Sequence, residues 1–354
     1  MDFVQQTGET LELLKHLISI RSVSKEEGAV TAFLFDYITN KGFEPFRKGN
    51  NIWLRNKYFS SELPTILLNS HIDTVKPCEG WTIDPFTPFE NRDKLYGLGS
   101  NDAGLPLSSL FSVFQYFYSK KSLGYNLIYA ATAEEEISGK NGIQSILSEL
   151  GTIDLGIIGE PTNMKIAVAE KGLIVMDCYS SGTASHAAHA EQNNAILNCL
   201  DDLQWFKNYQ FEKKSTLLGD TKASVTQINA GKQHNVIPDR CHFVVDVRVN
   251  DKYSNQEIVD LIKDSIKSEV KARSLRLNST CIAEDHPIVK KGKDIGLDIF
   301  GSQTLSDQAL LKFPSVKIGP GDSVRSHTAD EFIYIDEIEN GIKTYINLLN
   351  GLKL

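Results

Sequence analysis

Short apolar runs alternate with helical stretches in the first half of the chain, and this alternation limits the folds that the sequence can adopt. Four runs have the length of strands and are bounded by turn residues: 51–55, 65–69, 126–132 and 155–158. Helical periodicity is present in the segments around them, at 10–20, 28–40, 105–118 and 141–150. Strands that alternate with helices predict an α/β fold whose sheet is covered on its faces.

The pattern changes after Lys171. Strands are expected at 173–179, 223–229, 242–249 and 274–281, and helices at 192–206 and 255–268. Their order, β-α-β-β-α-β, is the ferredoxin-like arrangement. The first pattern then resumes, with a helix at 306–311, a strand at 316–318 and a helix at 336–349. We therefore expect one domain from residues 1–169 and 283–354, and a smaller domain, residues 170–282, inserted into it.

Composition excludes several classes of protein. The 37 basic and 45 acidic side chains give a net charge of −8, which argues against a nucleic-acid or membrane partner. No apolar run approaches the ~18 residues of a membrane span, and Asp2, Glu9 and Glu12 occur where a signal peptide needs basic residues. The five cysteines are scattered without a CxxC pair, so neither a disulfide framework nor a cysteine metal site is indicated. We expect a cytoplasmic protein.

Imidazole and carboxylate side chains gather in the loops that follow the expected strands or precede an expected helix. The set is His71, Asp73, Asp102, Glu134 to Glu136, Glu160 and His327. Sites in open α/β sheets form outside the carboxyl ends of the strands. Two imidazoles with several carboxylates suit Zn²⁺ or another borderline divalent ion, whereas Mg²⁺ and Ca²⁺ favour oxygen ligands alone.

Each of these loops, taken alone, also has an ordinary explanation. A single His-x-Asp pair is weak evidence for a metal, and Glu134 to Glu136 is also explained as a solvated helix start. Glu160 precedes Pro161 and is also explained as a turn residue. Five such loops in one pattern favour a metal site.

Six motifs occur in an order that resembles a known enzyme family: SHIDTV, WTIDPF, GLGSNDAG, AEEE, GEPT and GPGDSVRSHTADEF. They are similar to motifs of the di-zinc deacylases and peptidases that include acetylornithine deacetylase, succinyl-diaminopimelate desuccinylase and carboxypeptidase G2-like enzymes. The resemblance covers nearly the whole chain. It implies a zinc-peptidase-like catalytic domain with an inserted ferredoxin-like lid and dimerisation domain. One departure is Ala103-Gly104, where many relatives have Met-Lys.

The resemblance also implies two divalent metal ions, zinc with cobalt as an alternative. His71 and Glu160 would hold one ion, Glu135 and His327 the other, and Asp102 would bridge both.

Two further residues receive roles around these ligands. Asp73 would orient His71, as ligating imidazoles generally require, and Glu134 would be the general base. Two metals about 3.5 to 4 Å apart can lower the pKa of a bridging water and polarise an amide carbonyl. A carboxylate beside them can accept the proton of the water and pass it to the leaving amine, so the expected reaction is amide hydrolysis.

The inserted domain would supply an oxyanion donor. A loop of small residues ends at His186, and the resemblance implies that this imidazole donates to the tetrahedral oxyanion, often from the partner subunit of a homodimer. His189 is an alternative in the alignment, and a surface position without function is the other explanation for His186.

Asn235 and Arg248 match family positions that contact the carboxylate of the substrate. Arginine suits bidentate recognition of a carboxylate. Arg248 alternatively pairs with Asp246 or Asp251.

The pattern GPGDSxxxHTxDE is more similar to acetylornithine and acetyl-lysine deacylases than to the desuccinylases. The first hypothesis is therefore a metal-dependent amidohydrolase of N-acyl amino acids, an acetylornithine deacetylase of arginine biosynthesis. Hydrolysis of succinyl-ornithine or succinyl-diaminopimelate is the nearest alternative, followed by a di- or tripeptidase.

An inactive binding protein on the same fold is a hypothesis of another class, although no expected ligand is missing. Serine hydrolysis is disfavoured because Gly97-Leu-Gly-Ser-Asn101 does not fit a Gly-x-Ser-x-Gly elbow.

Overall fold

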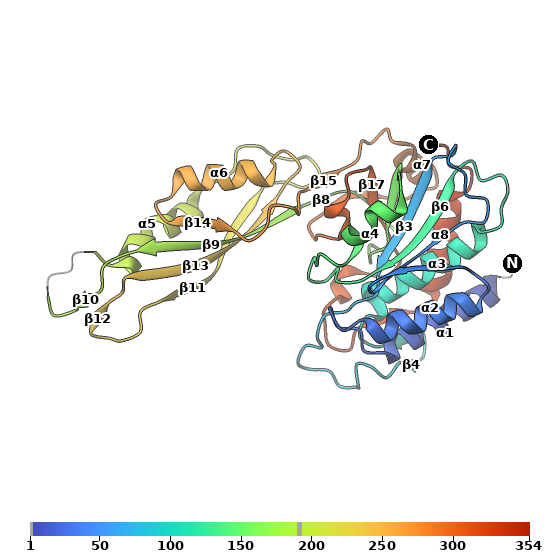
Figure 1. The fold of residues 1–354 in the computed structure, drawn as a ribbon, viewed down its shortest axis with the longest axis horizontal. Helices are drawn as coiled ribbons and strands as arrows, with labels where there is room; N and C mark the ends of the chain where they lie inside the picture. Colours follow the sequence, from blue (N-terminus) through green and yellow to red (C-terminus); the bar gives the residue numbers. More distant parts are fainter. Residues whose placement is uncertain (1–2, 190–192) are drawn as a thin grey trace. The chain divides into compact units, whose positions relative to one another are not determined.

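The computed structural model describes residues 3–189 and 193–354. The chain forms two compact units. Unit 1 contains the described residues up to Val168 together with Ile282–Phe300 and Ser306–Leu354, and unit 2 contains Ala169–Cys281 and Gly301–Leu305. Unit 1 thus combines the blue N-terminal elements with the red C-terminal ones (Figure 1). None of the helices in the described part of the chain has the length and apolar character that a membrane span requires.

Unit 1 is built around a mixed sheet with the strand order β1-β2-β6-β3-β7-β17-β8. Its strands are β1 (Phe46–Lys48), β2 (Asn51–Arg55), β3 (Thr65–His71), β6 (Asn126–Thr132), β7 (Leu155–Ile158), β8 (Ile166–Glu170) and β17 (Ser315–Lys317), and β16 (Ile299–Ser302) pairs with β8. The strands β6, β3, β7 and β17 run parallel to their neighbours in this set. Every residue in these four strands is buried. The strands β3, β6 and β7 therefore contain the apolar runs of the sequence, and all four strands end at one edge of the sheet.

Helices and a small second sheet complete unit 1. The helices are α1 (Phe3–Ser19), α2 (Gly28–Asn40), α3 (Leu105–Phe117), α4 (Ile143–Leu150), α7 (Pro287–Asp294) and α8 (Asp336–Leu349). The short turns are η1 (Ser100–Gly104), η2 (Asp307–Leu310) and η3 (Ser323–Arg325), and the small sheet contains β4 (Phe89–Asn91), β5 (Lys94–Tyr96) and β18 (Phe332–Tyr334). Helix α3 packs against β3 and β6 and also contacts α1 and α8. Because α3 has neighbours on several sides, most of its surface consists of apolar or small side chains.

Unit 2 has the ferredoxin-like order of elements expected from the sequence. The elements are β9 (Gly172–Ser181), α5 (Ala195–Asn208), β11 (Lys222–Ala230), β13 (Arg240–Val249), α6 (Asn255–Ser265) and β14 (Glu269–Ala272). The strands form an antiparallel sheet in the order β11-β13-β9-β14. Alternate residues of β9 and β13 form a core with α5 and α6. Two short strands, β10 (Ser185–His186) and β12 (Val236–Ile237), pair with each other, and β15 (Thr280–Cys281) pairs with β8.

The last strand of the four-stranded sheet lies earlier than the sequence predicted. Helix α6 ends at Ser265, and β14 occupies 269–272 in place of the expected 274–281. The reason is that Val270 fills the core while its neighbours Glu269 and Lys271 are exposed, a strand alternation too short to detect by periodicity.

Candidate metal centre

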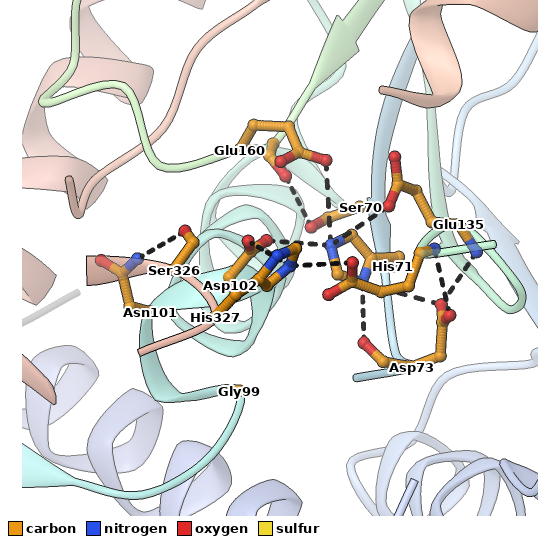
Figure 2. Close-up of polar contacts among 12 residues, drawn as sticks. Ser70, His71, Asp73, Gly99, Asn101, Asp102, Glu135, Glu160, Ser326 and His327 are labelled. Carbon is orange, nitrogen blue, oxygen red and sulfur yellow. Dashed lines mark hydrogen bonds and ion pairs between the residues drawn. The ribbon is translucent and has the colours of Figure 1, made fainter. Parts of the chain in front are cut away.

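Four adjacent parallel strands of unit 1 carry polar side chains at their shared carboxyl edge. His71 is the last residue of β3, residues 134–136 follow β6, and Glu160 follows β7. His327 lies in the loop after β17, and Asp102 lies in η1. The side chains of His71, Asp102, Glu135, Glu160 and His327 converge (Figure 2). The alternation of strands and helices thus brings distant parts of the sequence to one place.

The first group of donors surrounds His71, whose side chain is 1% exposed. Its Nε2 lies 3.2 Å from Asp102 Oδ1, 3.8 Å from Glu160 Oε1 and 4.0 Å from Glu135 Oε2. The Nδ1 nitrogen lies 2.8 Å from the backbone carbonyl of Asp73, and a carbonyl only accepts. Nδ1 therefore donates its proton, which leaves Nε2 directed at the carboxylates.

The second group of donors surrounds His327. Its Nε2 lies 3.0 Å from Glu136 Oε2 and 3.5 Å from Asp102 Oδ2. Asp102 thus presents Oδ1 to one imidazole and Oδ2 to the other. A carboxylate in this position is able to serve two cations at once.

Two observations show that these residues fit divalent ions. Among the described residues, the buried atoms Glu136 Oε1 and Glu160 Oε1 have no hydrogen-bond partner. A buried carboxylate oxygen without a partner is costly, and a cation would satisfy it. Within each group, the donor atoms also lie 3.0–3.8 Å from the imidazole nitrogen. Two ligand atoms of a tetrahedral zinc site are separated by a similar distance, about 3.4 Å when each bond to zinc is about 2.1 Å.

The pKa values reflect a surplus of carboxylates. Burial lowers the pKa of His71, but the hydrogen bond to Asp102 and the charges of Glu135 and Glu160 raise it well above its usual value. Burial, with the Asp102 charge, raises the pKa of Glu160 to about 8. The hydrogen bond to Glu136 raises the pKa of His327 to about 9. Protons are thus held strongly in this cluster, and a metal ion would have to displace them.

Asp73 connects the two halves of the centre. Its backbone carbonyl, rather than its carboxylate, accepts from His71, since the carboxylate Oδ1 is 3.7 Å from His71 Nδ1. The carboxylate accepts from the backbone amides of Glu135 (3.0 Å) and Glu136 (3.2 Å) and from the Ser24 hydroxyl (2.7 Å). One residue therefore sets the position of an imidazole and of the acidic loop.

The position of Glu134 does not agree with the role of general base expected from the sequence. Its carboxylate accepts from Asn141, from the backbone amide at 3.2 Å and from Nδ2 at 2.8 Å. Its backbone is left-handed, with φ 56°, whereas Glu135 and Glu136 reach the donor groups. The expected pairing of Glu135 with His327 is also corrected, because it is Glu136 Oε2 that lies 3.0 Å from His327 Nε2. Within the acidic triplet, the side chains of Glu135 and Glu136, and not that of Glu134, therefore lie among the donor groups.

Sequence reasoning assigned no role to Glu136 and missed two further carboxylates, Asp307 and Glu331. Asp307 is buried and accepts from Thr132 Oγ1 (3.0 Å) and Asn69 Nδ2 (3.2 Å), and burial raises its pKa to about 6. Glu331 is buried and accepts from backbone amides near Asp102. The only signal for Glu331 was its place in the motif that contains His327.

The other expected site residues lie in unit 2. His186 is exposed on β10, where it pairs with Val236 of β12, and the Asn235 carbonyl accepts from the adjoining Ala187 amide (3.0 Å). Arg248 makes two hydrogen bonds to Asp246, of 2.9 and 3.1 Å, which is one of the alternatives considered for it.

The sequence pattern of peptidase family M20/M25/M40 matches residues 67–351. The chain belongs to this family. It is 25% identical to a succinyl-diaminopimelate desuccinylase of Orientia tsutsugamushi (strain Ikeda), an alignment that covers 96% of this chain and 95% of the relative. It is 29% identical to a [LysW]-lysine/[LysW]-ornithine hydrolase of Sulfurisphaera tokodaii, with 97% and 95% covered.

Solved structures agree with this assignment at the level of the fold. The YXEP protein of Bacillus subtilis, a dinuclear metal-binding peptidase of the M20 family, superposes with a TM-score of 0.75 at 15% identity and 98% coverage of both chains. The expected fold class is confirmed. As an M20 protein with desuccinylase relatives, the chain is a hydrolase that acts on amide bonds.

Proposed function

We propose that this M20 hydrolase removes the acyl group from an N-acylated amino acid, with N-acetylornithine as the first candidate substrate. The observation that carries the proposal is the arrangement of Asp102, which offers one carboxylate oxygen to each of two imidazole-containing donor groups. The choice of an acylated amino acid is supported by the relatives, whose names refer to succinyl-diaminopimelate and to lysine or ornithine conjugates.

Two divalent cations fit the donor groups. His71, Asp102 and Glu160 would hold one ion, and Asp102, Glu136 and His327 would hold the other. Zinc or cobalt in these positions supplies Lewis acidity, which lowers the pKa of water and polarises an amide carbonyl.

Glu135 is the general base in this proposal. Its carboxylate is 11% exposed and lies 4.0 Å from His71 Nε2, and it is not needed to complete either donor group. Burial, together with the charge of Glu160, raises the pKa of Glu135 well above its usual value. A carboxylate with a raised pKa is suited to accept a proton from the attacking water and to deliver it to the leaving amine. The Asp73 carboxylate holds the backbone from which Glu135 projects.

Unit 2 supplies the remaining polar groups. His186 donates to the oxygen on which negative charge develops, and this stabilises the transition state. Asn235 and Arg248 bind the α-carboxylate of the substrate. The pair of hydrogen bonds to Asp246 fixes the plane of the Arg248 guanidinium and so prepares it for that contact.

A homodimer formed through unit 2 is part of the proposal. Strand β11 lies at the edge of its sheet and exposes Val225 and Ile228. Helix α5 exposes Ile196, Leu197 and Leu200. Apolar side chains beside a strand edge favour association with another chain.

The function is tested by steady-state hydrolysis with metal-loaded protein. The substrates are acetyl-ornithine, succinyl-ornithine, succinyl-diaminopimelate, a dipeptide and a tripeptide. We expect the highest kcat/KM with acetyl-ornithine, and Glu135→Gln protein is the control for contaminating activity. A preference for a succinylated substrate or a peptide would replace the proposed substrate by that alternative. Two bound metals without turnover of any compound would favour a binding protein.

A further inference from the structure

Glu331 is a buried carboxylate next to the metal centre that has no place in the proposed reaction. It is 1% exposed and lies immediately before β18, four residues after His327. Both of its oxygens accept from backbone amides of the loop that contains Asp102. Oε2 accepts from Gly99 (3.1 Å), and Oε1 accepts from Asn101 (2.8 Å) and Asp102 (3.0 Å).

We propose that Glu331 is a positioning residue that holds the Asp102 loop in the shape required for metal binding. The inference rests on the proposed function, because it assigns Asp102 to both metal ions. A shared carboxylate must direct its two oxygens at different cations, so small rotations of its backbone disturb both sites. Three amides bound by one carboxylate fix that backbone directly.

The loop turns sharply where Glu331 contacts it. Gly99 has φ 73°, and a Cβ at this position would lie 2.5 Å from Thr74 Cγ2, so the chain turns sharply in a confined space. An extended or turning backbone with buried amides needs acceptors from outside, since an unmet buried donor costs about 1–3 kcal/mol. Glu331 supplies acceptors for three of these amides.

A second set of contacts joins the same two segments. Asn101 Oδ1 accepts from the amide of Asp322 (3.0 Å), and its Nδ2 donates to the Asp322 carbonyl (3.0 Å) and to Ser326 Oγ (3.1 Å). The segment 322–331 therefore contacts the Asp102 loop through Glu331 and through Asp322 and Ser326, and it also contains His327. These contacts hold the loop and the segment together, with Asp102 Oδ2 3.5 Å from His327 Nε2.

The test is metal binding by the metal-free protein, measured by calorimetric titration with Zn²⁺ in competition with a chelator. Glu331→Gln preserves size, but it replaces one acceptor oxygen by an amide that faces a backbone donor. Loss of an outer contact of this kind weakens metal binding by about 10- to 100-fold. We expect that loss for at least one of the two ions, with Glu331→Asp between the wild type and Glu331→Gln. Activity of Glu331→Gln is expected to recover at excess zinc with little change in KM.

Asp202→Asn is the matched control. Asp202 is a buried carboxylate of unit 2 that also accepts from two backbone amides, Lys267 (3.0 Å) and Ser268 (2.9 Å). Its loss is expected to lower the unfolding temperature while zinc affinity stays at the wild-type value, which separates destabilisation from positioning.

The outcomes separate the inference from the proposed function. Wild-type zinc affinity in folded Glu331→Gln would overturn the positioning role. If Glu331→Gln does not fold, the comparison of Glu331→Asp with Asp202→Asn decides, and equal zinc affinity of these two variants would also overturn it. A wild-type protein that binds no zinc would instead overturn the proposed function.

Discussion

The exchange of Glu134 and Glu135 for glutamine, one at a time, separates the structure-based assignment of the acidic triplet from the sequence-based one. Glu134→Gln keeps an acceptor oxygen for one of the two hydrogen bonds from Asn141. The glutamine oxygen is able to keep the bond from the Asn141 backbone amide, and the Asn141 side chain is able to turn so that its oxygen accepts from the new amide. At most one hydrogen bond is therefore lost, at a cost of about 1–3 kcal/mol of stability, and we expect kcat to fall by less than about 10-fold.

Glu135→Gln is expected to behave differently. The side chain of Glu135 lies 4.0 Å from His71 Nε2, in the donor cluster, and its glutamine variant cannot accept a proton. General-base catalysis contributes about 10²- to 10⁴-fold, so kcat should fall by that factor. The two metal ions should remain bound, because neither proposed donor group depends on Glu135.

The assay measures kcat at saturating substrate and metal content by elemental analysis on the same samples. Wild-type protein carried through the same exchange of metal is the control. If Glu134→Gln were inactive with both metals bound, and Glu135→Gln had lost metal, the structure-based assignment would be refuted.

Four further predictions follow from the proposed function. His327→Ala should lower the metal content from two ions per chain to one, because His327 belongs only to the second donor group, and elemental analysis that still gives two would remove it from the site. In the metal-free protein the pKa of Glu160 is raised to about 8 and that of His327 to about 9, so zinc must displace protons and its affinity should rise from about pH 6 to about pH 9; a chelator-competition series that is flat with pH would contradict this. His186→Ala should lower kcat by about 10²- to 10³-fold with metal content intact, whereas Arg248→Ala should mainly raise KM for substrates with a free α-carboxylate; steady-state kinetics of both variants would show whether the two effects are reversed. If His186 acts on the partner's site, mixing Glu135→Gln chains with His186→Ala chains should restore activity in hybrid dimers, and no recovery despite subunit exchange seen by mass spectrometry would place His186 in its own chain's site or in a structural role.

Much of the candidate metal centre was predictable because apolar runs and polar loops meet at the ends of buried strands. His71 is the last residue of a strand whose residues are all buried, and Glu160 and His327 follow two other such strands, so the change in residue type marks the edge of the sheet. Imidazole and carboxylate side chains at one edge then indicate a metal of borderline character.

The assignment within the triplet was not predictable, because three glutamates in a row differ only in their backbone conformation. The left-handed φ of Glu134 and its contact with Asn141 turn that side chain away from its expected role, and neither has a signature in local periodicity. Glu331 was missed for a related reason. Its partners are backbone amides of residues 99–102, and a hydrogen bond to the backbone of a distant segment leaves no pattern in the order of side chains along the sequence.

The strand order of unit 1 also has a consequence for synthesis on the ribosome. Strand β17 lies inside the large sheet, between β7 and β8, but it is translated after all of unit 2. Until residues 315–317 emerge, β7 and β8 lack the neighbour that joins them, and each has an open edge of buried, apolar strand. The unit that begins at the N-terminus is thus the one completed last, and the nascent chain is exposed to misassociation between the synthesis of β7 and that of β17.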